Sequence, residues 1–132
     1  MLFTMKAVCE KTGMTYETLK FYCNQGLVPH VKRDAGNRRV FDERDVAWIE
    51  SLGCVKRCGL SIQEMRHYVQ LCLQGEASIP ERKKILAQKR QALVEQIAQL
   101  QGAVAYVDQK QAFYEDVLAG KRPYVSNLLP QE

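Results

Sequence analysis

The chain has 132 residues and is 46% hydrophobic, which is typical of one domain or of a small domain with an appendage. It contains no apolar run long enough to cross a bilayer, and Lys6, Glu10 and Lys11 interrupt its N-terminal stretch. We therefore expect neither a signal peptide nor a membrane partner. The five cysteines form no C-x-x-C pair, which predicts reduced thiols in a cytoplasmic protein and not a disulfide framework.

The positive charge is concentrated near the N-terminus. Residues 1–41 contain seven Lys and Arg against three acidic residues, a net charge of +4, which equals the net charge of the whole chain. Residues 42–132 therefore sum to zero. A localised basic excess is the electrostatic pattern of a phosphate-binding surface, so we expect double-stranded DNA as a partner.

Two short helices open the chain. Thr4 can cap the first, which covers about residues 4–11 and ends at Gly13. Thr15 can cap the second, which ends at Gly26. Two short helices joined by a glycine-containing turn are typical of a helix-turn-helix motif.

A basic hairpin follows the second helix. Residues 31–33 and 39–41 flank a four-residue turn in which both Gly36 and Asn37 tolerate the positive φ that hairpin turns require. A helix beside a basic ribbon fits a duplex, because the helix can enter a major groove while the ribbon follows the phosphates.

Three more helices are predicted. Asp42 caps a third helix that ends at Gly59, and Ser61 opens a capping box for a fourth that runs to about Cys72. A second capping box at residues 78–81 opens a long helix that extends to about Ala119.

The long helix carries a heptad repeat. One seam position is occupied by Leu86, Leu93, Leu100, Val107 and Tyr114, and its companion by Arg90, Ile97, Val104, Gln111 and Leu118. A narrow seam sustained over about five heptads predicts a coiled coil. Self-pairing, antiparallel or parallel, is the simplest way to bury this stripe and would give a twofold homodimer.

Three segments resemble signatures of the MerR family of bacterial transcription regulators. They are Thr18-Leu19-Lys20-Phe21-Tyr22 followed by Gly26-Leu27-Val28, then Arg39-Val40-Phe41-Asp42, and then Gly59-Leu60-Ser61-Ile62-Gln63-Glu64-Met65. The chain departs from the family pattern at Lys20, Phe21 and Cys23, where Arg, Tyr and Glu are usual. Lys keeps the charge at position 20 but loses bidentate phosphate geometry.

The resemblance implies a mainly α fold. It comprises a winged helix-turn-helix domain over residues 1–75, a dimerisation helix over 76–120 that forms an antiparallel coiled coil, and a flexible tail over 121–132. It also implies a homodimer that distorts a pseudo-palindromic promoter so that RNA polymerase can engage. The DNA-binding residues it implies are Thr15, Tyr16 and Lys20 in the major groove, Tyr22 and Arg39 on phosphates, and Lys32, Arg33 and Arg38 in the wing.

Cys54 is the candidate sensor. On a helical wheel it lies off the apolar stripe of the third helix, in a strip of small residues with Ala47, Ser51 and Cys58. The neighbouring Lys56 and Arg57 could favour the reactive thiolate. The context of Cys54 is similar to the aldehyde- and thiol-stress-responsive branch of the MerR family, which implies modification of Cys54 by an aldehyde, another small electrophile or an oxidant, with Cys58 as a second site. Cys54 as a small packing residue is the alternative interpretation.

Other functions remain open at this stage. No Cys or His follows Cys72, so we expect no metal site of the family's usual architecture and no other cofactor. The alternatives are a metal-responsive regulator, an architectural DNA-binding protein without an inducer, and an enzyme. We expect no enzyme activity, because the chain has no glycine-rich phosphate loop and no redox motif.

Overall fold

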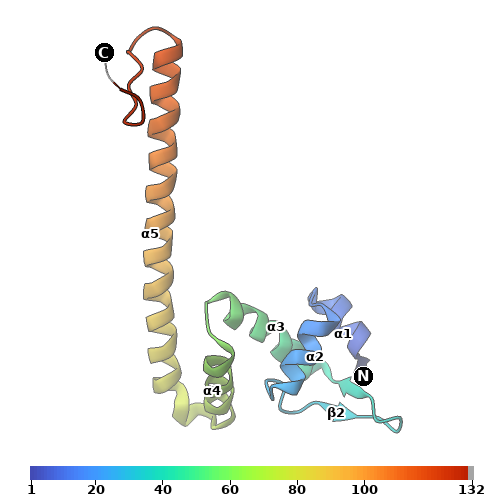
Figure 1. The fold of residues 1–132 in the computed structure, drawn as a ribbon. Coiled ribbons are helices and arrows are strands. Elements are labelled where there is room, and N and C mark those ends of the chain that lie inside the picture. The colour runs from blue at the N-terminus through green and yellow to red at the C-terminus, as the bar shows by residue number, and fades with distance from the viewer. Residues whose placement is uncertain (131–132) are drawn as a thin grey trace. The chain divides into compact units, whose positions relative to one another are not determined.

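The computed structural model describes residues 1–130 and is mainly α-helical (Figure 1). It divides into two compact units, Met1–Arg90 and the residues from Gln91 onward. We call the first the head unit and the second the tail unit. The helices are α1 (Met5–Thr12), α2 (Tyr16–Asn24), α3 (Glu43–Arg57), α4 (Ile62–Leu73) and α5 (Ile79–Leu118), with a 3₁₀ turn at Gly75–Ser78.

The predicted wing is present and gains a third strand. Strands β2 (Lys32–Arg33) and β3 (Arg39–Phe41) form the expected antiparallel hairpin, and β1 (Phe3–Thr4) pairs antiparallel with the other side of β3. The sheet order is therefore β1-β3-β2. A two-residue strand directly before a helix has no periodicity, which is why the sequence did not predict β1.

Of the two turn residues that tolerate positive φ, only Asn37 adopts it. Asn37 has a φ of 61°, whereas Gly36 is not among the residues with positive φ. The Asp34 carboxylate instead orders the turn, because its Oδ1 accepts hydrogen bonds of 2.9 Å from the backbone N–H groups of Gly36 and Arg38.

The N-terminal caps of four helices are confirmed. The side chains of Thr4, Thr15, Asp42 and Ser61 each accept a hydrogen bond from a backbone N–H in the first turn of α1, α2, α3 and α4. The Asp42 and Ser61 caps are reciprocal capping boxes. These caps satisfy amides that the helices leave without internal partners, so the helix starts could be predicted from local sequence.

The predicted capping box at residues 78–81 is wrong. Ser78 is 5% exposed, and its hydroxyl donates to the backbone oxygens of Leu71 and Gly75 while Arg82 Nε donates to it at 3.0 Å. Ser78 therefore satisfies carbonyls at the end of α4 rather than amides at the start of α5. Helix α5 nevertheless begins at Ile79, directly after Ser78, where the box placed its first residue.

The core of the head unit lies between α1, α2, α3, α4 and the wing. Its completely buried side chains include Val8, Leu19, Phe41, Ile49 and Met65. These side chains come from five elements that are separate in sequence. Burial of this apolar surface therefore fixes the helix-turn-helix and the wing against one another.

The head unit continues beyond the predicted boundary at residue 75. Ile85 of α5 packs against the core, and Lys89 Nζ lies 2.8 Å from Glu64 Oε2 on α4. The first turns of α5 therefore belong to the same compact unit as α4.

Helix α5 buries none of its residues within the chain. Apart from the half-buried Leu93, its heptad positions remain exposed, with Ile97 at 54%, Leu100 at 68% and Val104 at 60%. After α5, Arg122 lies over the Phe113 ring at 5.0 Å from its centroid, and Tyr124 packs edge-on against the same ring. No helix of the described residues is long and apolar enough to cross a membrane.

Candidate nucleic-acid interface

Helix α2 has one buried face and one exposed face. Leu19 and Tyr22 point into the core, whereas Tyr16 and Lys20, four residues apart, are both exposed. Residues at this spacing share one face of a helix. Tyr16 and Lys20 therefore lie on the exposed face of α2, and their contacts with bases stay a prediction.

The Thr15 hydroxyl is already occupied in the free protein. It accepts a hydrogen bond of 3.2 Å from the backbone N–H of Thr18 and donates to the Thr18 hydroxyl at 2.8 Å. Thr15 therefore stabilises the first turn of α2 as an N-cap. To donate a hydrogen bond to DNA, this hydroxyl would have to give up its hydrogen bond to the Thr18 hydroxyl.

Tyr22 is more buried than its predicted contact with phosphate suggests. It is 5% exposed and belongs to the core cluster, and burial raises the pKa of its hydroxyl. The phenol therefore stays protonated as a hydrogen-bond donor at neutral pH. Its predicted contact with a phosphate stays a prediction.

Arg39 connects the wing to α2. Its Nη2 donates to Asn24 Oδ1 at 2.6 Å, which links strand β3 to the last residue of α2. The sequence did not predict this role of Asn24, because the two residues are fifteen positions apart and follow no local pattern. The contact orients the guanidinium before DNA arrives, leaving its other N–H groups available for a phosphate.

Lys32 is held by an acidic pair at the start of α3. Its Nζ lies 3.1 Å from Asp42 Oδ2 and 3.9 Å from Asp45 Oδ2. The pKa of the Asp42 carboxyl is lowered, first by the backbone N–H of Asp45 and then by Lys32. These contacts join strand β2 to α3. Because two carboxylates lie close to its ammonium group, Lys32 contributes less positive charge to the wing surface than a lysine without acidic partners would.

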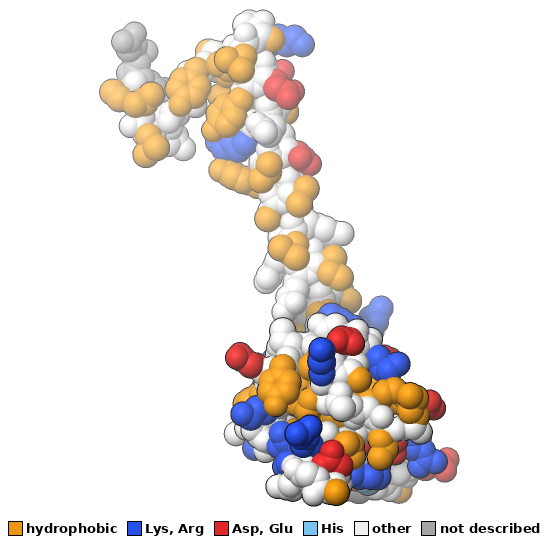
Figure 2. All heavy atoms as spheres, turned by 90° about the vertical axis from the view of Figure 1, so that its right-hand side faces the viewer, with side chains coloured by type: hydrophobic (Ala, Val, Ile, Leu, Met, Phe, Trp, Pro, Cys, Tyr) orange, Lys and Arg blue, Asp and Glu red, His pale blue; other side chains and the backbone are white. Residues whose placement is uncertain are grey.

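Two further wing cations complete the predicted set. Arg33 is exposed and its Nη1 donates to the backbone oxygen of Asn37 at 2.9 Å, across the hairpin turn. Arg38 is also exposed. Figure 2 shows Lys and Arg side chains spread over one face of the head unit, with exposed hydrophobic side chains between them.

Sequence analysis also missed Arg66 on α4. Its guanidinium donates to the backbone oxygen of Gln25 at 3.2 Å and to the Gln25 side-chain oxygen. Gln25 caps the C-terminal end of α2, so Arg66 positions that end of the helix. The contact spans forty-one residues, and no spacing rule would have found it.

Cys54 is exposed on α3. Its sulfur lies 3.2 Å from the guanidinium Nη2 of Arg57, one turn further along the helix. The contact places the Arg57 guanidinium directly beside the exposed sulfur. Of the two basic neighbours considered from the sequence, Arg57 is therefore the one in contact with Cys54.

The other thiols are less accessible than Cys54. Cys58 is half-buried, and its backbone N–H caps the end of α3 on the carbonyl of Cys54 at 3.2 Å. Burial is the main cause of the raised pKa values of the Cys9 and Cys23 thiols. Among the described residues, no three His, Cys, Asp or Glu side chains are grouped so that they could hold a metal ion.

A capped helix pair, an exposed face on α2 and a basic three-stranded wing define a winged helix-turn-helix DNA-binding protein. The MerR HTH family regulatory protein model matches residues 3–72, and the MerR DNA-binding model matches residues 48–110. The chain belongs to the MerR family and is a DNA-binding transcriptional regulator of the MerR type.

Two curated relatives match most of the chain. The HTH-type transcriptional regulator AdhR of Bacillus subtilis is 41% identical over 88 residues, which are 67% of this chain and 63% of that protein. An uncharacterised HTH-type regulator of Haemophilus influenzae is 31% identical over 90% of this chain and 88% of its own length.

A solved structure of similar fold contains DNA. HiNmlR, described as a MerR family regulator lacking the sensor domain and bound to promoter DNA, superposes with a TM-score of 0.77 at 31% identity, covering 90% of each chain. These likenesses confirm the predicted resemblance and the predicted fold of a winged head followed by a long helix. The family consists of regulators, which agrees with the expectation that the chain is not an enzyme.

Proposed function

We propose that the protein binds promoter DNA as a homodimer and activates transcription when an electrophile modifies Cys54. The observation that carries the sensing role is the exposed Cys54 sulfur in contact with the Arg57 guanidinium. RNA polymerase at the promoter is the second partner in this proposal, and the cytoplasm is the compartment in which it would act.

Dimerisation is proposed from the exposed seam of α5. A lone helix cannot bury a heptad stripe, and Ile97, Leu100 and Val104 are all more than half exposed in the single chain. Pairing of two α5 helices, in the antiparallel arrangement predicted above, would remove these side chains from water. It would also join two heads, each able to bind one half of a palindromic site.

The chemistry at Cys54 is addition of the thiolate to an electrophilic carbon. With an aldehyde, the sulfur forms a bond to the carbonyl carbon, the C=O π electrons move to oxygen, and that oxygen takes a proton to give a hemithioacetal. With a quinone, the sulfur adds to the ring instead. In either case the product adds bulk on the side of α3 that carries Ala47 and Ser51, both exposed small residues.

The added bulk would change how the two heads present their α2 helices to DNA. The exposed strip of small residues on α3 suits close packing by a second helix, so a larger group at Cys54 would displace that helix. Bending or untwisting a promoter costs on the order of a few kcal/mol, so a modest change in head orientation is sufficient to alter promoter shape.

The test is a cysteine series assayed on the chain's own promoter. Cys54→Ser should leave promoter binding unchanged and abolish activation by aldehydes or quinones. Cys23→Ser is the matched control, because this half-buried thiol has its pKa raised by burial. Normal activation in the Cys54→Ser protein would refute the sensing role without touching the DNA-binding assignment.

Arg57 provides a second, independent readout. Arg57→Gln removes the cation that contacts the sulfur, so alkylation of Cys54 by iodoacetamide at pH 7 should slow by about threefold to tenfold. Lys56→Gln, the matched neighbour without a contact to this sulfur in the structure, should change the rate little. Equal rates in both variants would show that Arg57 does not activate the thiol.

A further inference from the structure

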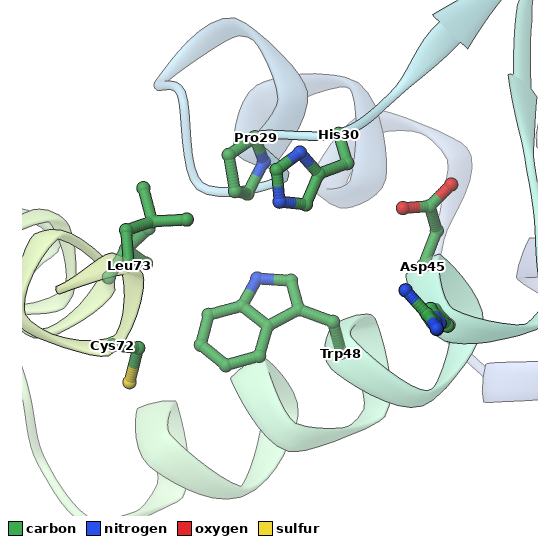
Figure 3. A pocket seen from close by; sticks show the side chains of 8 residues that line it. Pro29, His30, Asp45, Trp48, Cys72 and Leu73 are labelled. Atoms are coloured by element: carbon green, nitrogen blue, oxygen red, sulfur yellow. The ribbon is translucent and has the colours of Figure 1, made fainter. Parts of the chain in front are cut away.

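The head unit contains an apolar pocket of about 260 Å³ that the proposed DNA binding and thiol sensing do not use. Three segments line it: the loop after α2, the first half of α3, and the end of α4. The lining residues are Pro29, His30, Arg44, Asp45, Trp48, Val69, Cys72 and Leu73. Figure 3 shows Pro29 and His30 on one side, the Trp48 indole opposite them, and Leu73 and Cys72 at one end.

The walls of the pocket favour a flat molecule. The indole of Trp48 faces the pyrrolidine ring of Pro29 and the imidazole of His30 across the opening (Figure 3). The indole is fixed in this position, because its Nε1–H donates to the backbone oxygen of Leu27 at 2.7 Å. An engineered cavity of about 150 Å³ accepts benzene, so this pocket has room for an aromatic ring with one small substituent.

Two charged side chains line the pocket, Arg44 and Asp45, and they differ in whether they are already paired. None of the ion pairs among the described residues involves Arg44. The neighbouring carboxylate of Asp45 is buried and already occupied, since its Oδ2 accepts the backbone N–H of Asp42 at 2.9 Å and lies 3.9 Å from Lys32 Nζ. The Arg44 guanidinium is therefore the lining cation without an ion pair among the described residues, and it can donate to an acceptor on the ligand.

We propose that this pocket is a reversible binding site for a small aromatic carboxylate or carbonyl compound. The ring lies against Trp48 and the ligand oxygen accepts from Arg44. The pocket joins the loop that leads into β2 to the end of α4, so an occupied pocket would brace the wing against α4. This site is independent of Cys54 and would give the regulator a second, non-covalent input.

Trp48 makes the proposal directly measurable, because it is the one tryptophan in the chain. Benzoate is the probe and the Cys54→Ser protein is the sample, so modification of Cys54 cannot contribute. Titration should change Trp48 fluorescence saturably, and calorimetry should give the same dissociation constant. Cyclohexanecarboxylate, which is not flat, and benzylammonium, which carries the opposite charge, should both bind more weakly.

Two variants test the residues. Arg44→Gln should weaken benzoate binding by about tenfold, because it replaces a charge-assisted hydrogen bond. Arg38→Gln, an exposed arginine outside the pocket, should leave it unchanged. Leu73→Trp should fill the pocket and abolish binding measured by calorimetry. Leu73 is 49% exposed, so the larger side chain is compatible with folding.

Several results would overturn the proposal. They are an unsaturable fluorescence change, equal binding by the Arg44→Gln and Arg38→Gln proteins, or binding of benzylammonium as tight as that of benzoate. A loss of dimerisation in the Leu73→Trp protein, together with no benzoate binding, would show instead that a second copy of the chain covers this surface. None of these outcomes depends on whether Cys54 senses electrophiles.

Discussion

The two units of this protein differ in how far their hydrophobic side chains are buried within the chain. In the head unit, Phe41, Ile49 and Met65 are completely buried by elements of the same chain. Along α5, Leu100 and Val107 lie in an equally regular pattern and remain more than half exposed. The comparison teaches that the head is stable through contacts within one chain, whereas the seam of α5 is stabilised only when a second surface covers it.

The largest expected effect is in the head core. Phe41→Ala should lower the free energy of unfolding by about 3–5 kcal/mol, because it leaves a cavity where the wing meets α1 and α3. Chemical denaturation followed by circular dichroism measures the change. The loss should be the same at low and high protein concentration. A loss of unfolding free energy that becomes smaller at high protein concentration would show that the head unit, like the seam of α5, depends on contacts with a second chain.

The next largest effect is on self-association. Leu100→Lys places a charge in the seam and should raise the dimer dissociation constant by roughly 100-fold. Analytical ultracentrifugation measures it. Gln101→Lys, the exposed neighbour outside the seam, is the matched control and should dimerise normally. If both variants dimerise like the unmodified chain, the seam of α5 is not the dimer interface.

A smaller effect is expected where the wing meets α2. Asn24→Ala removes the acceptor that orients Arg39 and should weaken promoter binding by about fivefold. The salt dependence of binding should not change, because no charge is lost. Arg39→Ala should weaken binding more and also lower the slope of log K against log salt by about one per head. Anisotropy titrations over a range of salt concentrations separate the two variants.

The smallest effect concerns acid stability. The pKa of the Glu64 carboxyl is lowered to about 2, first by its hydrogen bond with Lys89 and then by its hydrogen bond with the backbone of Ser61. Because the folded pKa lies below the unfolded value of about 4.3, this contribution is complete above pH 4.3 and is lost as the pH falls towards 2. The melting temperature of Glu64→Gln should therefore fall less between pH 5 and pH 2 than that of the unmodified chain. Equal falls in melting temperature between pH 5 and pH 2 for the two proteins would show that ionised Glu64 does not stabilise the fold.

Local patterns in the sequence predicted much of the fold. Caps at Thr15, Asp42 and Ser61, the glycine stop at Gly13 and the heptad repeat of α5 all depend on residues a few positions apart. The contacts that shape the DNA-binding surface do not. Arg39 with Asn24, Arg66 with Gln25, and Trp48 with Leu27 join residues fifteen or more positions apart.

The sequence prediction for Ser78 failed for the same reason. A serine three residues before a glutamate is a good local signal for a helix cap. The Ser78 hydroxyl instead hydrogen-bonds to the backbone oxygens of Leu71 and Gly75 at the nearby end of α4. The burial of Tyr22 could have been anticipated, because it lies three residues after the core residue Leu19 on the same helix face. The pocket at Trp48 could not, since its walls come from three separate segments.

The most direct test of the account is a titration of a fluorescently labelled duplex carrying the chain's own promoter, with the mass of the complex measured by sedimentation. Two chains should bind each duplex, and the slope of log K against log salt should be on the order of −5 or steeper. One chain per duplex, or an affinity that salt does not change, would contradict the account.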